Sequence, residues 1–170
     1  MSLAVRHGGR AWPRRVGAGI VLAAAGASGI GAAQAATFKV TWLAPADDPR
    51  LERSRIERGA LGHPGGPALD AFKVALAEGR LELETAGAKL ELEVVDVPDA
   101  AAAKAAAARV EKAGSAAIVT DLPAAWTLAV ADGAARTPVL NVGSAADALR
   151  QADCRRNLWH LAPSERMRAD

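Results

Sequence analysis

Two short apolar segments of the sequence, 116–120 and 138–142, each end in small or polar residues. If both segments are strands of a parallel sheet, their carboxyl ends lie at one edge of that sheet. Loops and helix N-termini at such an edge point backbone N–H groups toward ligands. Main-chain, hydroxyl and carboxylate groups placed there can hold a small polar molecule. The candidate ligand-binding residues are Asp121, Leu122, Gly143, Ser144 and Ala145.

Two of these side chains also fit a purely structural role. Asp121 lies two residues before Pro123, where a helix is expected to begin, so its carboxylate suits a helix cap as well as a ligand contact. Ser144 fits the cap of a following helical turn better than a ligand contact, although one hydroxyl can serve both roles. The sequence leaves both alternatives open.

Signatures of catalysis and of metal binding are missing from the sequence. It contains no Gly-x-Ser-x-Gly elbow, no Walker phosphate loop, no Gly-x-Gly-x-x-Gly turn and no His-Glu-x-x-His motif. His63 and His160 stand apart from Cys, Asp or Glu at metal-ligand spacing, so we expect no metal site. We therefore expect a protein that is not an enzyme, with no catalytic residues and no cofactor.

Alternating strand and helix patterns must position the candidate loops. Strands are predicted at 38–44, 90–97, 116–120, 138–142 and 158–161. Helices are predicted at 48–58, 68–77 (ended by Gly79), 100–113 (capped by Asp99), 123–134 and 145–150, with a last one capped by Ser164. The connections are too long for hairpins. The expected fold class is therefore α/β, a flavodoxin-like parallel sheet with helices on both faces.

An export signal is predicted at the N-terminus. The first 17 residues carry four Arg and no acidic residue, and an apolar run of about 16 residues follows them. Ala33 and Ala35 then form an Ala-x-Ala cleavage site. Residues 1–35 are therefore predicted to be a signal peptide, cleaved between Ala35 and Ala36.

A membrane anchor is the alternative to a cleaved signal, but the apolar run is shorter than the roughly 20 residues that span a bilayer. Arg14 and Arg15 leave the twin-arginine export route open. Removal of the signal leaves 17 of the 21 basic side chains against 19 acidic ones, a net charge of −2. A nucleic-acid partner is therefore not expected, because the basic excess it needs belongs to the signal.

The remaining distinctive side chains are expected in the protein core. Cys154 is the only cysteine, so it cannot form an internal disulfide, and we expect it as a small buried apolar side chain. Trp42, Trp126 and Trp159 lie in apolar segments and fit core packing better than stacking against a ligand.

Several segments in a fixed order resemble one family of transport proteins. After the signal come Lys-Val-Thr-Trp-Leu-Ala-Pro, Leu-Glu-Val-Val-Asp, Ala-Ile-Val-Thr-Asp and Pro-Val-Leu-Asn-Val-Gly-Ser. This order is similar to the first lobe of type I periplasmic binding proteins of branched-chain amino acid ABC transporters. Asp47-Asp48-Pro49-Arg50 and the segment 153–170 resemble a subgroup associated with pyrroloquinoline-quinone (PQQ)-dependent alcohol oxidation. The resemblance covers residues 37–170.

The resemblance implies a two-lobed clamshell that closes on its ligand. Residues 36–162 would form the first lobe, and residues 163–170 would begin the crossover into a second lobe that is not in this chain. The implied partners are a small-molecule ligand and an ABC transporter permease, with no nucleic acid and no contact with the membrane except through the permease. The implied location is the periplasm.

The candidate loops depart from the family pattern in a way that bears on the ligand. Amino-acid-binding members hold the ligand carboxylate and ammonium with Ser and Thr after the third and fourth strands. Here Asp121 and Pro123 follow the third strand, and Ser144 alone offers a hydroxyl after the fourth. A carboxylate repels an anion, so the expected ligand is a neutral or cationic small organic solute. The resemblance to the PQQ-associated subgroup implies a link to alcohol catabolism.

Two other classes of function remain as alternatives. An exported flavodoxin-like enzyme or electron-carrier domain would need a phosphate-binding loop after the first strand, where Asp47 and Asp48 instead bring negative charge. A secreted structural module would have no second lobe.

Overall fold

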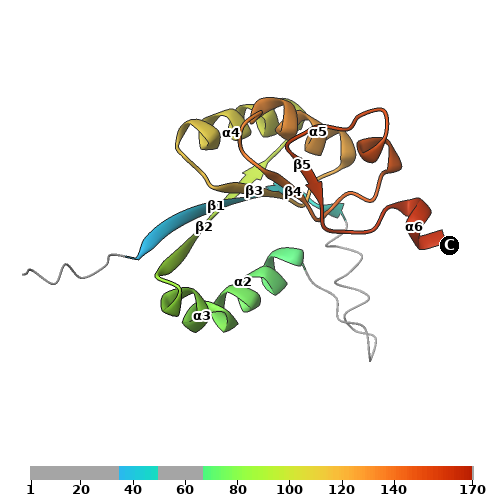
Figure 1. Ribbon diagram of the computed structural model, residues 1–170. Coiled ribbons are helices and arrows are strands. Elements are labelled where there is room, and N and C mark those ends of the chain that lie inside the picture. The colour runs from blue at the N-terminus through green and yellow to red at the C-terminus, as the bar shows by residue number, and fades with distance from the viewer. Residues whose placement is uncertain (1–34, 50–66, 170) are drawn as a thin grey trace, which may run out of the picture. The chain divides into compact units, whose positions relative to one another are not determined.

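The computed structural model describes residues 35–49 and 67–169. Five strands of these ranges form one sheet in the order β2-β1-β3-β4-β5, and every neighbouring pair is parallel. The predicted α/β class with a parallel sheet is thus confirmed (Figure 1). The strands are β1 (Ala36–Pro45), β2 (Ala88–Val97), β3 (Ala117–Thr120), β4 (Val139–Asn141) and β5 (Leu158–His160).

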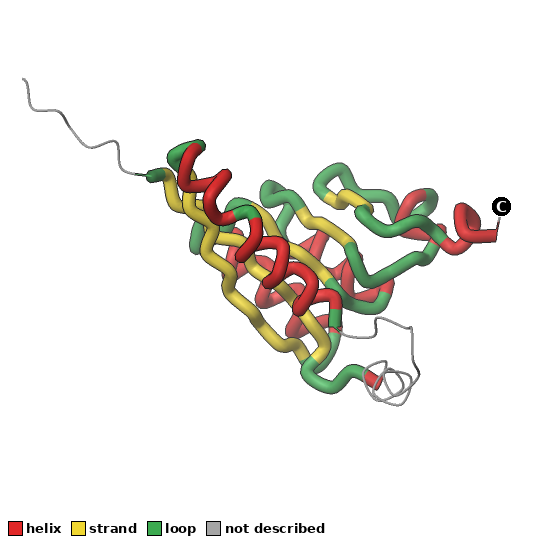
Figure 2. The backbone as a smooth tube through the Cα atoms, turned by 90° about the horizontal axis from the view of Figure 1, so that it is seen from below, coloured by secondary structure: helices red, strands yellow, loops and turns green. Residues whose placement is uncertain are grey.

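Helices lie on both faces of the sheet, as predicted. In Figure 1, α4 and α5 lie on one face, and α2 and α3 lie on the other, next to β1 and β2. Figure 2 shows α2 and α3 in front of these two strands. The helical elements are α2 (Ala68–Glu78), α3 (Arg80–Thr85), α4 (Ala100–Lys112), α5 (Ala124–Gly133), the 3-10 turn η1 (Asp147–Arg150) and α6 (Glu165–Ala169). The helix predicted over 48–58 falls largely outside the described residues.

Helix α4 begins and ends where its sequence signals indicate. The Asp99 side chain accepts a hydrogen bond from the backbone N–H of Ala102 at 2.7 Å, which satisfies one of the unpaired donors of the first turn. Gly114 has a φ of +80°, a left-handed conformation that glycine adopts without steric cost. The predicted cap and stop of this helix are both confirmed.

The region after α2 differs from the prediction. Gly79 ends α2, but its φ of −77° is right-handed, and a second helix, α3, begins at Arg80. The Gly79 carbonyl accepts a hydrogen bond from the Leu83 N–H at 3.1 Å, so Gly79 joins two helices. The sequence analysis did not predict α3, because it took Gly79 as the end of the helical segment, whereas the backbone of this glycine stays right-handed.

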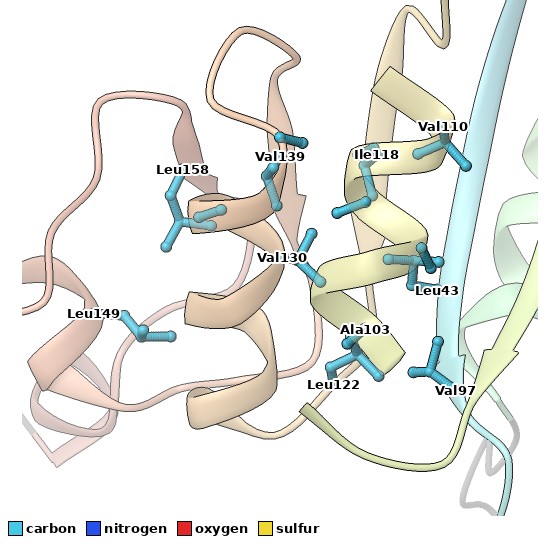
Figure 3. Close-up of a cluster of buried hydrophobic side chains, with 14 residues drawn as sticks. Leu43, Val97, Ala103, Val110, Ile118, Leu122, Val130, Val139, Leu149 and Leu158 are labelled. Atoms are coloured by element: carbon cyan, nitrogen blue, oxygen red, sulfur yellow. The ribbon is translucent and has the colours of Figure 1, made fainter. Parts of the chain in front are cut away.

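The main core lies between the sheet and helices α4 and α5. Leu43, Ile118 and Val139 come from three adjacent strands, and all three are fully buried against these helices (Figure 3). On α4 the core positions include Ala103 and Ala107, both with no exposed surface. Small side chains there let the helix pack close to the strands, and each large aliphatic side chain buried beneath it contributes about 1.5 to 3 kcal/mol.

A second cluster covers the opposite face of the sheet. Trp42 is 2% exposed, and its ring lies 5.3 Å, centroid to centroid, from that of Phe72 on α2. Val40 and Val119 complete the buried part of this cluster. Trp126 is half-buried against the main core, so the core role predicted for Trp42 and Trp126 is confirmed.

The same prediction is wrong for Trp159, which is 61% exposed. In the strand register, Trp42 pairs with Val119, Val119 with Leu140, and Leu140 with Trp159. This row therefore lies on one face of the sheet, the face covered by α2 and α3 near β1 and β2 (Figure 1). Trp159 lies at the far end of the row, beyond those helices.

Cys154 is also exposed, contrary to prediction. It lies in the loop between η1 and β5, where the chain runs over the surface instead of entering either cluster. Small size makes burial of a cysteine common but does not fix it.

No helix within the described residues has the length and apolar composition needed to cross a membrane.

Candidate ligand-binding site

The carboxyl ends of β3 and β4 lie side by side, as the parallel sheet requires. Thr120 pairs with Asn141 in the strand register, so the loops that follow these residues are neighbours. The two loops border an open groove of about 440 Å³. The groove is lined by Leu122, Pro123, Ala124, Gly143, Ser144, Ala145, Ala146 and Glu165. Four of the five candidate residues therefore meet at one surface.

Asp121, the fifth candidate, lies directly beneath Gly143. A Cβ atom added to Gly143 would come within 2.5 Å of Asp121 Oδ1 and 2.8 Å of Asp121 Cα. Any side chain at position 143 would thus collide with backbone as well as with a carboxylate. The glycine therefore lets the two loops touch.

The loop after β4 is held by a side chain that sequence reasoning did not select. Asn141 is fully buried, and its Oδ1 accepts a hydrogen bond from the Ser144 N–H at 2.9 Å. Its Nδ2 donates to the Ser144 carbonyl oxygen at 2.7 Å. The available signal was a single amide inside the otherwise apolar run 138–142, because a buried polar group needs partners.

Ser144 itself is 8% exposed, and its Oγ accepts a hydrogen bond from the Ala146 N–H at 3.4 Å. The following turn, η1, has Ala146 at its N-cap position and no side-chain cap. The predicted capping role of Ser144 is therefore wrong: it closes a tight local turn, not the start of a helix. Its hydroxyl lies at the groove.

Asp121 does not cap α5 either. The N-cap of α5 is Pro123, and no side chain caps this helix. The Asp121 N–H donates instead to the Leu43 carbonyl oxygen at 3.0 Å, which continues the β1–β3 pairing by one residue. The Trp126 N–H of the first turn of α5 donates to the Pro123 carbonyl oxygen at 3.0 Å, whereas the Ala124 and Ala125 N–H groups precede the first acceptor within the helix, and Ala124 lines the groove. These donors suit a polar or partly negative ligand atom.

Leu122 has a different role from the one predicted. Its side chain has no exposed surface and belongs to the main core (Figure 3). The Leu122 carbonyl oxygen accepts a hydrogen bond from Thr127 Oγ1 at 3.2 Å, inside α5. Leu122 therefore anchors the β3 loop from the core, beneath the surface of the groove that it lines.

The loop after β5 joins the same edge. The Glu165 N–H donates to the Ala145 carbonyl oxygen at 2.8 Å, which ties the start of α6 to the β4 loop. Ser164 is buried, and its Oγ accepts from the Met167 N–H at 3.3 Å, so the predicted cap of this helix is confirmed. Arg150 of η1 donates through Nη2 to the Ala162 carbonyl oxygen, and this hydrogen bond links η1 to the loop after β5.

His160 contacts the buried amide of Asn141. Its Nδ1 lies 3.0 Å from Asn141 Nδ2. Burial lowers the pKa of the imidazole below its ordinary value of 6.5, and the nearby Arg150 guanidinium lowers it further, whereas a backbone hydrogen bond with Leu149 opposes both. Both main effects favour the neutral ring.

Within the described ranges, no three His, Cys, Asp or Glu side chains gather closely enough to hold a metal ion. Two other hollows, of about 430 and 490 Å³, are lined by residues at the amino ends of the strands. In an open parallel sheet, ligands bind at the carboxyl ends, so we assign the candidate site to the β3–β4 groove.

Comparison with solved structures identifies the architecture. The chain is similar to the branched-chain amino acid transporter substrate binding protein LivJ from Streptococcus pneumoniae, solved in complex with isoleucine, with a TM-score of 0.53 and 16% identity. The match covers 75% of this chain and 34% of that one. The fold is that of one lobe of a type I periplasmic binding protein. This lobe therefore spans about a third of the LivJ chain.

Two further solved structures match with lower TM-scores. A possible leucine/isoleucine/valine-binding protein from Rhodopirellula baltica matches with a TM-score of 0.48 and 17% identity, over 70% of this chain and 30% of that one. A leucine binding protein, LivK, from Thermotoga maritima matches with a TM-score of 0.49 and 19% identity, over 76% and 33%. No protein-family model and no curated protein matches the chain.

Proposed function

We propose that this chain is the substrate-binding component of an ABC importer, which captures a small organic solute in the periplasm and delivers it to a membrane permease. The observation that carries the proposal is the groove between the β3 and β4 loops, at the sheet edge where this fold binds ligands. The fold it shares with LivJ supports the same role. The protein would bind and release its solute without converting it.

The proposal includes the division of the chain into lobes. Residues 36–162 form the first lobe, and residues 163–170 begin the crossover to a second lobe that would close over the groove. An open groove fits this arrangement, because one lobe alone leaves a bound solute in contact with water on its other side. The first-turn N–H groups of α5 and the Ser144 hydroxyl would hold the polar part of the solute.

The solute class follows from what the groove offers. Ser144 is the one hydroxyl among its lining residues, Glu165 is the one carboxylate among them, and Asp121 adds a second carboxylate next to Gly143. A negative solute placed near the Asp121 carboxylate would bind less tightly by about 1 to 3 kcal/mol, or roughly 5- to 150-fold. We therefore propose a neutral or cationic solute. A link to PQQ-dependent alcohol catabolism is proposed on the resemblance of segments 47–50 and 153–170 alone.

A thermal-shift screen of the full-length protein tests this function. The panel holds leucine, isoleucine and valine together with small neutral alcohols, aldehydes and amines, and it is repeated with Asp121→Asn. A cationic solute should lose about tenfold in affinity in this variant, and a neutral one should change little. Asp70→Asn, an exposed carboxylate on α2, is the matched control and should behave as the wild type.

Two results would contradict the proposal. If no member of the panel stabilises the wild type, solute capture of this class is wrong. Strong stabilisation by leucine or valine that is unchanged in Asp121→Asn would instead show that Asp121 does not act on the ligand.

A further inference from the structure

The buried amide of Asn141 connects His160 to the candidate groove, and its hydrogen bonds fix its orientation. The Ser144 backbone N–H can only donate, so the atom of Asn141 that faces it must be the oxygen. The other atom, Nδ2, then carries two hydrogens. One reaches the Ser144 carbonyl oxygen at 2.7 Å, and the other reaches His160 Nδ1 at 3.0 Å.

This arrangement assigns the proton on His160. Because Nδ2 of Asn141 donates to Nδ1, that ring nitrogen must have a free lone pair. The ring hydrogen therefore lies on Nε2, and the imidazole is neutral. Protonation of Nδ1 would put an N–H against an NH₂ group, and a buried donor that faces another donor loses its hydrogen bond.

We propose that His160 is a positioning residue for the ligand loop: as the neutral imidazole it holds Asn141, and Asn141 holds Ser144 at the groove. This inference rests on the proposed function for the identity of the groove. It goes beyond that function by assigning a pH-sensitive support to the loop. Acidification turns the acceptor Nδ1 into a donor, frees Asn141 to reorient, and loosens the turn from Asn141 to Ser144.

The groups around His160 act in opposite directions: burial and the Arg150 guanidinium favour the neutral ring, whereas the backbone hydrogen bond with Leu149 favours the protonated one. β4 presents the uncharged Asn141 amide, η1 presents the Arg150 guanidinium, and Leu149 presents a backbone group. One Arg150 nitrogen, Nη1, is buried with no hydrogen-bond partner in the described structure, so its charge is incompletely compensated. A second positive charge on His160 is therefore disfavoured.

The test is a pH titration of the full chain by NMR between pH 5 and 8, without solute. We expect the His160 ring to show the Nε2–H tautomer at pH 8, and the Ser144 amide signal to shift with the same midpoint as the ring. Hydrogen exchange of the Ser144 amide should be about fivefold faster below that midpoint than above it, after correction for the intrinsic pH dependence.

Two variants separate positioning from a general structural role. In His160→Asn the side-chain oxygen can accept from Asn141 near the former place of Nδ1 and does not titrate, so the Ser144 amide should keep its pH 8 signal throughout. His160→Leu offers no acceptor, and the amide should be displaced at every pH. If the leucine variant does not fold, the wild-type titration and His160→Asn still decide the question.

The proposal is overturned if His160 titrates while the Ser144 amide stays still, if the amide shift persists in His160→Asn, or if the ring carries its proton on Nδ1 at pH 8. These signals are recorded without solute. A failed solute screen would therefore count against the proposed function and leave this result intact, and the reverse also holds.

Discussion

At the scale of single residues, the candidate site depends more on the groups behind the groove than on those lining it. Asn141 is fully buried, and Leu122 lies in the core. Neither side chain is available to a solute, yet both fix the loops that border the groove. In the proposed site, Ser144 and the α5 N-terminus would supply the polar contacts, and both line the groove. The sequence analysis selected these surface residues but not the buried side chain of Asn141 that supports them.

The contact of Gly143 with Asp121 makes the first prediction. Gly143→Ala should lower the free energy of unfolding by about 1 to 3 kcal/mol, because the added Cβ would meet the Asp121 backbone at 2.8 Å and the loops would have to separate. Urea unfolding of the variant and the wild type measures this difference.

Gly114→Ala is the control for Gly143→Ala. Gly114 has a φ of +80° and open space around its Cβ position, so alanine there costs only backbone strain, about 1 kcal/mol. Gly143 does not have a positive φ. Equal or smaller destabilisation at Gly143 would show that the loops do not touch as described.

The lowered pKa of His160 predicts a pH dependence of stability. Because folding lowers this pKa below 6.5, the unfolded chain binds a proton at a higher pH than the folded one. The free energy of unfolding should therefore be highest above pH 6.5, where His160 is neutral in both states. It should fall as the pH drops below 6.5 and level off once the pH passes below the pKa of His160 in the folded protein. Urea unfolding of the wild type and His160→Asn across pH 5 to 8 gives the difference curve. A flat difference curve would contradict the assigned cause.

At the scale of elements, the sequence predicted those features of a helix or strand that depend only on neighbouring residues. The cap at Asp99 and the stop at Gly114 could be predicted, because each acts on its own helix. The junction at Gly79 could not, since a glycine permits both a left-handed stop and a right-handed continuation. Tertiary packing chooses between them, and it does not appear in a window of sequence.

The cap of α4 gives the prediction that belongs to this scale. Asp99→Ala should lower the free energy of unfolding by about 1 kcal/mol, because the Ala102 N–H loses its acceptor. Asp99→Ser keeps an acceptor oxygen and should stay within a few tenths of a kcal/mol of the wild type. Urea unfolding of the three proteins decides the matter, and an equal loss in both variants would rule out the capping bond as the cause.

At the scale of the whole molecule, the sheet brings together residues that are distant in the sequence. The α/β class could be predicted from alternation alone, and the parallel arrangement then places all carboxyl ends at one edge. The contact of Asn141 with His160 depends on the register between β4 and β5, which alternation does not determine. The exposure of Trp159 likewise depends on where α2 and α3 stop covering the sheet, which is a property of the assembled fold.

The start of β1 supports the last prediction, that the exported protein begins at Ala36. β1 begins at this residue, and the Ala36 nitrogen already donates to the Gly87 carbonyl oxygen at 2.8 Å, in register with β2. Cleavage after Ala35 would leave the strand whole, and the new terminal amine could keep the same hydrogen bond. Mass spectrometry of the exported protein should give the mass of a chain that starts at Ala36. Replacement of Ala35 by a bulky residue such as Phe should block processing, because the site requires a small side chain there. Recovery of the wild type from the membrane fraction with Met1 retained would contradict the prediction and favour the anchor.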